Sequence, residues 1–214
     1  MVGLFVLAAV TAFTPPRLLS GEPPGLPAPT VVGGGEVIVE ATIDTSGKVS
    51  HAILLRDTPP YGDMLLTAIK GWRFTAAREP VRDGIDRAVE AQVLVAAVYR
   101  PPTSVNGPTL GATPRDLSGA SAVVAYPIAM PMPSYPPQAA SGGVVLMEVL
   151  LDQAGIVRDT RTIHPAPPFD TVARSALSQW NFRGATVKSE RVPSVAYIVM
   201  GFPVPIVPPA VTPH

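Results

Sequence analysis

The chain has 214 residues, and its 16 Lys and Arg side chains balance its 16 Asp and Glu side chains. A formal net charge of zero argues against nucleic acid or another polyanion as the partner. The absence of Cys excludes disulfides, thiolate metal sites and a Cys nucleophile, and the three His residues show no metal-ligand spacing. The sequence therefore predicts no metal and no cofactor.

The N-terminal residues 1–13 are nearly all apolar and are followed at once by two prolines and an arginine. This run is shorter than the roughly 20 residues that a membrane-spanning helix needs, and it matches the apolar region of a secretory signal. The basic residues that normally precede such a region are missing, so an anchor that begins further upstream and a frayed apolar terminus stay open. We expect a periplasmic protein, exported by this signal or anchored in the inner membrane.

An internal repeat sets the architecture. Residues 35–74 align without a gap on residues 143–182, each residue with the one 108 positions later. Eleven of the 40 aligned positions are identical, whereas unrelated sequences would share about two or three. The identical residues in the first copy are Gly35, Val37, Glu40, Asp44, Gly47, Val49, Pro59, Pro60, Ala68, Trp72 and Phe74. The chain therefore carries one small fold twice.

The first copy reads as strand, hairpin turn, strand, helix and strand, over residues 36–43, 44–48, 49–55, 64–72 and 88–99. The first strand alternates apolar and polar side chains, which is typical of a half-buried strand. Gly47 is placed for the left-handed conformation of the turn, and Gly62-Asp63 offers a helix N-cap. Residues 78–87 form a charged, solvated loop before the third strand.

The second copy repeats this order over residues 144–151, 152–155, 156–163, 170–180 and 193–202. The predicted fold class is α+β, with two tandem β-β-α-β units. In each unit a helix covers one face of a three-stranded antiparallel sheet. The predicted division of the chain is a signal and Pro-rich linker, a first domain, a Pro/Gly-rich linker, a second domain and a tail: residues 1–30, 31–100, 101–130, 131–205 and 206–214.

The first copy has Asp44, Gly47, Trp72, Arg73 and Phe74, and the second has Tyr135, Pro136, Asp152, Gly155, Trp180 and Phe182. These ordered motifs resemble the TonB C-terminal domain, and the two matches cover about two thirds of the chain. The first copy lacks the leading Tyr-Pro, and the second has Asn181 where Arg is usual. The long charged spacer of the family is also absent, which favours a soluble or shortly tethered relative.

This resemblance implies an exported, non-enzymatic adaptor with no catalytic residue and no small-molecule substrate. TonB-like proteins couple an inner-membrane motor complex to outer-membrane receptors, and they bind an extended receptor segment by strand addition at a sheet edge. The resemblance places this acceptor edge on the third strand of each copy. The expected peptide-binding residues are Val89, Ala91, Val93, Val95, Val195, Tyr197 and Val199.

Two other functions stay open at the level of sequence. The two copies could pair edge to edge and form a structural envelope protein that binds no peptide. Alternatively, the fold could be the scaffold of an envelope hydrolase or protease. The absence of Cys and of a paired-carboxylate pattern weighs against an enzyme, and Asp44 and Asp152 fit the role of turn residues.

Overall fold

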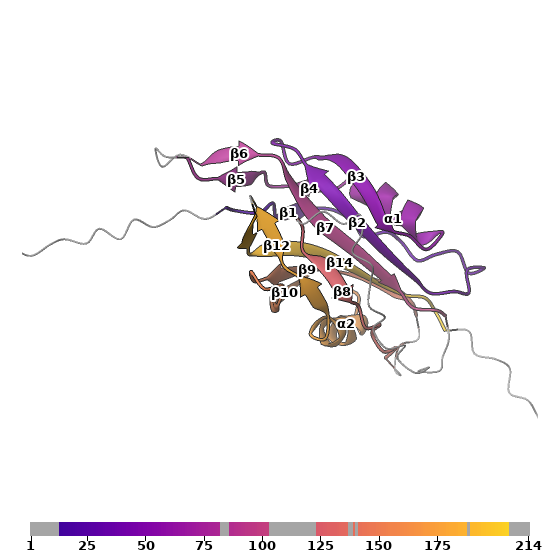
Figure 1. The fold of residues 1–214 in the computed structure, drawn as a ribbon. Helices are drawn as coiled ribbons and strands as arrows, with labels where there is room; N and C mark the ends of the chain where they lie inside the picture. The colour runs from indigo at the N-terminus through magenta and orange to yellow at the C-terminus, as the bar shows by residue number, and fades with distance from the viewer. Residues whose placement is uncertain are drawn as a thin grey trace, which may run out of the picture.

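The computed structural model describes residues 13–81, 86–102, 123–136, 139, 141–187 and 189–205. Within these residues it is an α+β fold, with fourteen strands and two helices (Figure 1). The predictions for an N-terminal signal in residues 1–12, for linker residues 103–122 and for the tail, residues 206–214, lie outside the described residues.

One six-stranded sheet forms the centre of the molecule (Figure 1). Its strands lie in the order β10 (Val157–His164), β9 (Gly143–Leu151), β14 (Ser194–Phe202), β7 (Ala91–Tyr99), β2 (Gly35–Ile43) and β3 (Val49–Arg56). All neighbours are antiparallel except β14 and β7, which run parallel. The prediction of a separate three-stranded sheet in each half is therefore wrong, because β7 and β14 join the halves into one sheet.

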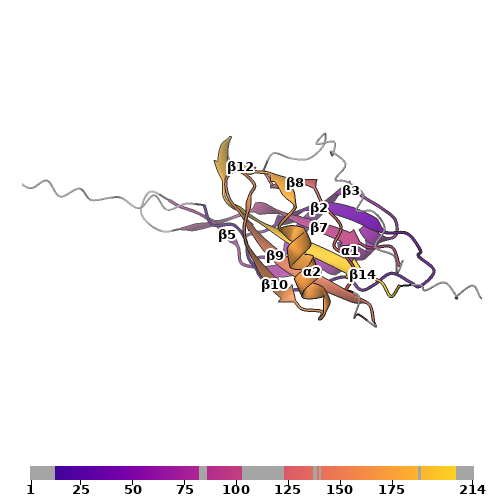
Figure 2. The ribbon, with the colours of Figure 1, turned by 90° about the horizontal axis from the view of Figure 1, so that it is seen from below.

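The two helices, α1 (Tyr61–Ile69) and α2 (Phe169–Leu177), lie on opposite faces of this sheet (Figures 1 and 2). The strand order reads the same from either end, and the two central strands are parallel. These two features relate the halves by an approximate two-fold rotation about an axis along the strands. Such a rotation turns one half over, which explains why the helices are on different faces.

Both helices begin directly after a cis Pro-Pro peptide bond, at Pro60 and at Pro168. The prediction that Asp63 caps the first helix is wrong, since Asp63 lies inside the first turn and no side chain caps the helix. The helix starts earlier because its first residue, Tyr61, belongs to the core. Its ring stacks on that of Tyr99 with centroids 4.3 Å apart.

Short strands outside the central sheet form four further pairs. Two are hairpins, β5 (Ala77–Glu79) with β6 (Arg87–Val89) and β12 (Ala185–Val187) with β13 (Glu190–Val192). The other two are β1 (Leu18–Ser20) with β4 (Arg73–Phe74) and β8 (Tyr126–Ala129) with β11 (Asn181–Arg183). The predicted third strand of the first copy is thus interrupted, and part of the predicted charged loop is a hairpin.

The segments ahead of each half lie against the sheet. Residues 13–30, which were predicted as a linker, contain β1 and a bridge between Thr14 and Arg78. Residues 123–135 contain β8 and follow a corresponding path in the second half. We call residues 13–23 and 123–132 the first and second strap. Both are part of the folded body rather than loose connections.

The core consists of two apolar layers, one on each face of the sheet. One layer contains α1 side chains, Trp72 and the first strap residue Leu18, and the other contains α2 side chains, Trp180 and second-strap residues such as Tyr126. The central strands are therefore buried on both faces. Each helix has only nine residues, and none in the described part of the chain is long and apolar enough to cross a membrane.

Candidate functional site

The third strands were predicted to be open sheet edges, and this prediction is wrong. β7 and β14 pair with each other over six residue pairs, from Leu94 with Ala196 to Tyr99 with Gly201. We call this parallel pairing the seam. On their other sides β7 pairs with β2 and β14 pairs with β9, so both strands lie inside the sheet. Backbone N–H and C=O groups along the seam bond to each other and offer no ladder to a peptide.

The seven predicted peptide-binding residues are consequently not on an edge. Six of them are buried in the two seam strands: Ala91, Val93, Val95, Val195, Tyr197 and Val199. Val89 lies outside the sheet, in β6, where it pairs with Ala77 of β5. The side chains of Val93, Val95, Val195, Tyr197 and Val199 belong to the core layer under α1.

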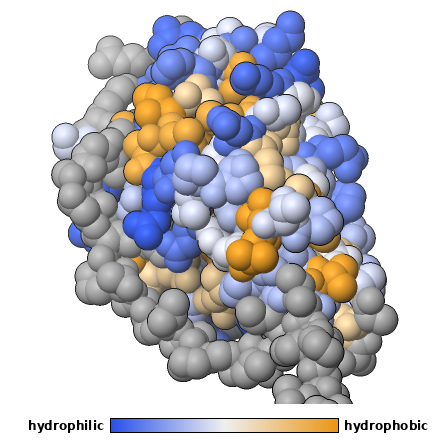
Figure 3. All heavy atoms as spheres, turned by 90° about the vertical axis from the view of Figure 1, so that its right-hand side faces the viewer, coloured by the Kyte–Doolittle hydropathy of each residue, from blue (hydrophilic) through white to orange (hydrophobic). Residues whose placement is uncertain are grey.

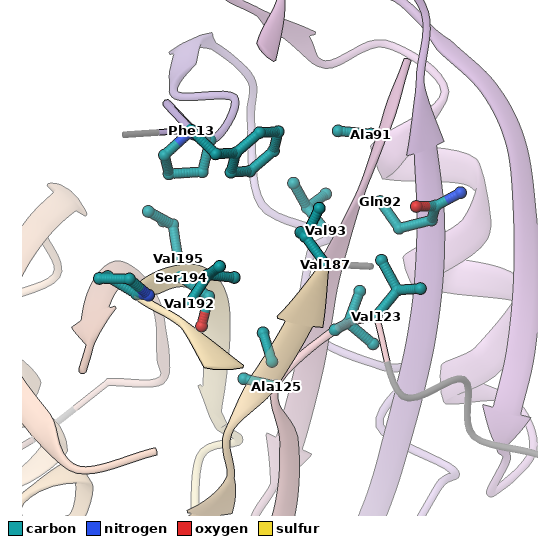
Figure 4. Close-up of a pocket in the computed structure, with 14 residues that line it drawn as sticks. Phe13, Ala91, Gln92, Val93, Val123, Ala125, Val187, Val192, Ser194 and Val195 are labelled. Atoms are coloured by element: carbon teal, nitrogen blue, oxygen red, sulfur yellow. The ribbon is translucent and has the colours of Figure 1, made fainter. Parts of the chain in front are cut away.

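An apolar hollow opens where the seam begins (Figure 4). The parallel pairing starts at Leu94 and Ala196, so the first residues of β7 and β14 are not joined to each other. In Figure 4 the ring of Phe13, from the first strap, lies across the hollow from Val123 and Ala125. The lining comprises Phe13, Pro15, Ala91, Gln92, Val93, Val123, Val124, Ala125, Ala185, Val187, Val192, Pro193, Ser194 and Val195. No titratable side chain is among these described lining residues.

A buried carboxylate is the most polar feature of the core. Glu148 of β9 is only 1% exposed, and it lies on the sheet face that carries the first strap. Arg17 of the first strap holds both of its oxygens, with Nε 2.8 Å from Oε2 and Nη2 bonded to Oε1. Arg161 Nε donates to Oε1 at 3.2 Å, and Tyr197 Oη donates to Oε2 at 3.3 Å. Four hydrogen bonds thus compensate the burial of this charge.

These hydrogen bonds stabilise the ionised form of Glu148. They also attach the first strap to the second half of the chain. Burial alone would raise the pKa of Glu148, but the hydrogen bonds and charges of Arg17 and Arg161 outweigh it and hold that pKa below its ordinary value. The hydrogen bond to Glu148 also raises the pKa of Arg17. The Tyr197 hydroxyl accepts the backbone N–H of Leu18 at 2.8 Å, which adds a second attachment.

Sequence reasoning missed this cluster, because Arg17 lies in a predicted linker. A signal was present in the sequence, since Glu148 interrupts the apolar run of β9 at a position whose neighbours on the same face are Leu146 and Leu150. A charge in such a position is rarely left unpaired. Both carboxylate oxygens of Glu148 are engaged by these hydrogen bonds.

The two motif aspartates are turn residues. Asp44 Oδ1 accepts hydrogen bonds from the backbone N–H of Ser46 at 2.8 Å and of Lys48 at 3.0 Å. Asp152 Oδ1 accepts those of Ala154 and Ile156, each at 2.9 Å. These bonds lower the pKa of both carboxyls. Carboxylates held ionised in two separate hairpins do not form the shared-proton pair of an acid protease.

The glycines of these turns are required by their backbone. Gly47 has φ of +81° and Gly155 has φ of +85°, in the left-handed region that disfavours other residues. A Cβ at Gly47 would lie 1.9 Å from the carbonyl oxygen of Phe74, and one at Gly155 would lie 2.3 Å from that of Phe182. The turns therefore pack tightly against the motif Phe residues.

The aromatic motif residues anchor the straps. Trp72 Nε1 donates to the carbonyl oxygen of Glu22 at 2.8 Å, and Trp180 Nε1 donates to that of Pro131 at 3.1 Å. Tyr135 packs edge-on against Phe169 and donates its hydroxyl to Ser141 O at 2.8 Å. The remaining motif residues Phe74, Pro136 and Phe182 are also buried, whereas Arg73 is exposed and donates to Trp72 O.

In the six-stranded sheet the strands with one partner are β3 and β10, at its two ends. Within the described residues β3 pairs only with β2, and β10 pairs only with β9. These outer strands are the edges of the six-stranded sheet in the described part of the chain. On the face shown in Figure 3 the hydrophobic surface forms separate groups between hydrophilic ones, so this view shows no large apolar patch.

The described residues contain no group of three or more His, Asp or Glu side chains that could hold a metal ion. A scan against protein-family models finds no match to the chain, and a search of curated proteins finds none either. The resemblance to the TonB C-terminal domain therefore depends on the motif residues of the sequence alone.

Proposed function

We propose that this chain is a non-catalytic protein of the cell envelope whose two TonB-type modules bind each other through their third strands. The observation that carries the proposal is the seam between β7 and β14. It occupies the two strands on which the family resemblance places peptide binding. In this arrangement the protein is a structural or adaptor component, and binding of a receptor segment at the third strands would require the seam to separate.

Matching contacts in the two halves support the duplication of one β-β-α-β module. Tyr61 stacks on Tyr99 in the first half at 4.3 Å, and Phe169 stacks on Phe202 in the second at 4.5 Å. Both motif Trp residues donate their Nε1–H to a strap carbonyl, Trp72 to Glu22 O and Trp180 to Pro131 O. Such agreement is expected of two copies of one fold and is hard to obtain by chance.

The non-catalytic part of the proposal is supported by the state of the polar side chains. Asp44 and Asp152 are engaged in separate turns, and Glu148 is ion-paired with Arg17. The hollow at the seam has an apolar lining. The periplasmic location is supported by the apolar character of residues 1–13. A partner would be an outer-membrane receptor or another envelope protein, with or without an inner-membrane motor complex.

Hydrogen exchange of the full chain tests the seam. Amides of Leu94, Val95, Ile198 and Val199 should be among the slowest to exchange, because their strands are paired on both sides and buried on both faces. Extended receptor segments added in excess should leave these rates unchanged. Rapid exchange along β7 and β14, or chemical-shift changes on these strands when a receptor segment binds, would contradict the proposal.

A separate measurement tests the compartment. Alkaline phosphatase fused after residue 205 is active only where its disulfides form, outside the cytoplasm. We expect activity in the native host when residues 1–13 are present and little when they are deleted. If both fusion proteins are found in the cytoplasm to the same extent, the proposed envelope location is wrong. The proposed pairing of β7 with β14 does not depend on this result.

A further inference from the structure

The folded body follows the apolar N-terminal run without a spacer. The run covers residues 1–13, and its last residue, Phe13, is also part of the lining of the apolar hollow. Thr14 exchanges two backbone hydrogen bonds with Arg78, each 2.9 Å long, and the backbone N–H of Arg17 donates to Thr75 Oγ1 at 2.9 Å. The chain is therefore attached to the body from the first residue after the run.

This attachment brings the surroundings of the apolar run close to the hollow. Consecutive Cα atoms are about 3.8 Å apart, so the run reaches the hollow within one residue. The family that the sequence resembles has a long charged spacer ahead of its C-terminal domain, and this chain lacks it. Entry of the run into lipid would therefore bring the hollow to the lipid surface.

The composition of the hollow suits contact with lipid. Its described lining has Gln92 and Ser194 as polar side chains, and the others are Val, Ala, Pro and Phe. Val123 is 41% exposed although it is large and apolar, and Pro193 is exposed as well. Contact with acyl chains would remove this apolar surface from water, which is favourable.

Two hairpins lie at the same end of the molecule as the hollow. β12 and β13 contribute side chains to the lining, and β6 leads into β7, whose first residues also line the hollow. Figure 1 shows both hairpins at the end of the central sheet where the first strap begins. Residues 77–90 and 185–193, which contain the hairpins, carry five basic and five acidic side chains. With charges balanced in this way, attraction to anionic lipid is weak.

We propose that this end of the folded body docks on the surface of a membrane, with the hollow and its rim against acyl chains and residues 1–13 in the lipid beside it. The inference rests on the proposed function, in which the apolar run supports an envelope location. It adds a second membrane contact, made by the body itself. Two contacts on one chain bind more tightly than either alone, because the second forms at a high effective concentration.

Docking at the hollow orients the central sheet. The hollow lies where β7 and β14 begin, and these nine-residue strands end at Tyr99 and Phe202. Nine residues of strand span about 30 Å, so the far end of the sheet is directed away from the membrane. Val32 and Val204 lie next in sequence to this far end, where Gly35 pairs with Tyr99, and they are 67% and 54% exposed. They provide matched control positions.

The test uses the full chain with vesicles of phosphatidylethanolamine and phosphatidylglycerol. Because the chain has no Cys, one introduced Cys directs an environment-sensitive fluorophore to a single site. The fluorophore on Val123→Cys should become brighter when vesicles are added and should be quenched by lipids with a nitroxide on the acyl chain. The fluorophore on Val32→Cys should show neither change. Equal responses at the two sites, or no response on Val123→Cys, would overturn the inference.

Matched variants assign the contact to the rim of the hollow. Val123→Asp combined with Val192→Asp introduces carboxylates that lipid contact would dehydrate, so vesicle binding measured by flotation should weaken about tenfold. Val32→Asp combined with Val204→Asp should leave binding within about twofold, because these charges lie more than a Debye length from the membrane. Slow hydrogen exchange along β7 and β14 confirms that each variant is folded. Equal binding by the two double variants would overturn the inference.

Salt distinguishes apolar contact from attraction between charges. Binding to vesicles of zwitterionic phosphatidylcholine should match binding to the anionic vesicles within about twofold, and it should persist at about 1 M salt. Binding that requires phosphatidylglycerol and is lost in salt would assign the contact to charged side chains and overturn the inference.

Two further measurements separate this inference from the proposed function. A protein that begins at Phe13 and stays in the soluble fraction of the envelope would show that the run is a cleaved signal, which rejects docking and retains the envelope location. A dimer in solution that Val123→Asp abolishes would assign the hollow to a second copy and overturn the inference. Slow exchange along β7 and β14, with no lipid contact at Val123, would reject docking and retain the self-paired modules.

Discussion

The four inner strands and the two outer strands of the sheet differ in composition as clearly as they differ in position. The seam strands β7 and β14 are apolar in nearly every residue and are buried on both faces. Every residue of the outer strands β3 and β10 is exposed or half-buried. An uninterrupted apolar strand thus marks a place in the middle of a sheet, which is the pattern expected of parallel pairing.

The same comparison shows that the two outer strands differ in how their edges are protected. Both outer strands are open in the described structure, but β10 carries charges and the Arg174 guanidinium, whereas β3 carries Ile53. Position in the sheet decides whether backbone groups are available. Side chains then decide whether another strand can reach them.

The largest predicted difference between inner and outer strands concerns a buried charge. Ala96→Glu places a carboxylate in the seam between Ile38 and Ile198, where no cation is near in the ladder, and should lower the free energy of unfolding by about 4 kcal/mol or more. Ala52→Glu makes the same change on β3 and should cost below about 1 kcal/mol. Urea unfolding followed by circular dichroism measures both, and similar costs would contradict the inner–outer division.

The turns that connect inner to outer strands should be the next most sensitive. Gly47→Ala and Gly155→Ala each force a Cβ against a carbonyl oxygen at positive φ, and each should cost about 2–3 kcal/mol. We expect faster hydrogen exchange in β3 for the first variant and in β10 for the second, with the seam unchanged. Loss of protection along β7 and β14 would show that the outer strands support the inner ones.

The buried carboxylate of Glu148 should make the free energy of unfolding depend on pH, whereas an exposed carboxylate on an outer strand should not. Because the pKa of Glu148 is held below its ordinary value of 4.5, its ion pairs stabilise the fold above that pH and are lost as the pH falls through the folded-state pKa. Glu148→Gln should therefore cost about 1–2 kcal/mol at pH 7, and less as the solution is acidified. The outer-strand control, Asp159→Asn, should cost below about 0.5 kcal/mol at pH 7. A pH-independent cost of Glu148→Gln would contradict this account.

The smallest expected effects concern the straps. Trp72→Phe and Trp180→Phe keep an aromatic ring but remove the N–H that bonds a strap carbonyl, so each should cost about 1 kcal/mol. Hydrogen exchange should become faster in β1 for the first variant and in β8 for the second. Unequal costs would show that the halves differ in more than their outer strands.

Much of the local structure follows from the sequence. The strands around residues 36–43 and 144–151, the Asp-Gly turns and the apolar side of each helix were predictable because they depend on neighbouring residues. The ends of the helices were less predictable, since Tyr61 and Phe169 start them by packing on core rings rather than by capping. Tertiary packing overrode the capping preference at these positions.

The candidate site was not predictable to the same extent. The seam joins strands about 100 residues apart, and period-two alternation alone does not identify which strand lies beside which. The run of β14 that follows Ser194, which contains no charged residue, was the available signal of an internal strand. The role of Arg17 required knowledge that the first strap crosses to Glu148 of the other half, a contact between residues 131 positions apart.

The ion pair between Arg17 and Glu148 bears on what happens when the chain is cleaved between its two halves. Because this contact and the seam both cross between the halves, covalent continuity between residues 102 and 123 is not what holds the halves together. A chain cleaved in that interval should keep its shape and elute as a single species. Two separately synthesised fragments should likewise find each other and complement, so the gene could be split at this point without loss of the folded product.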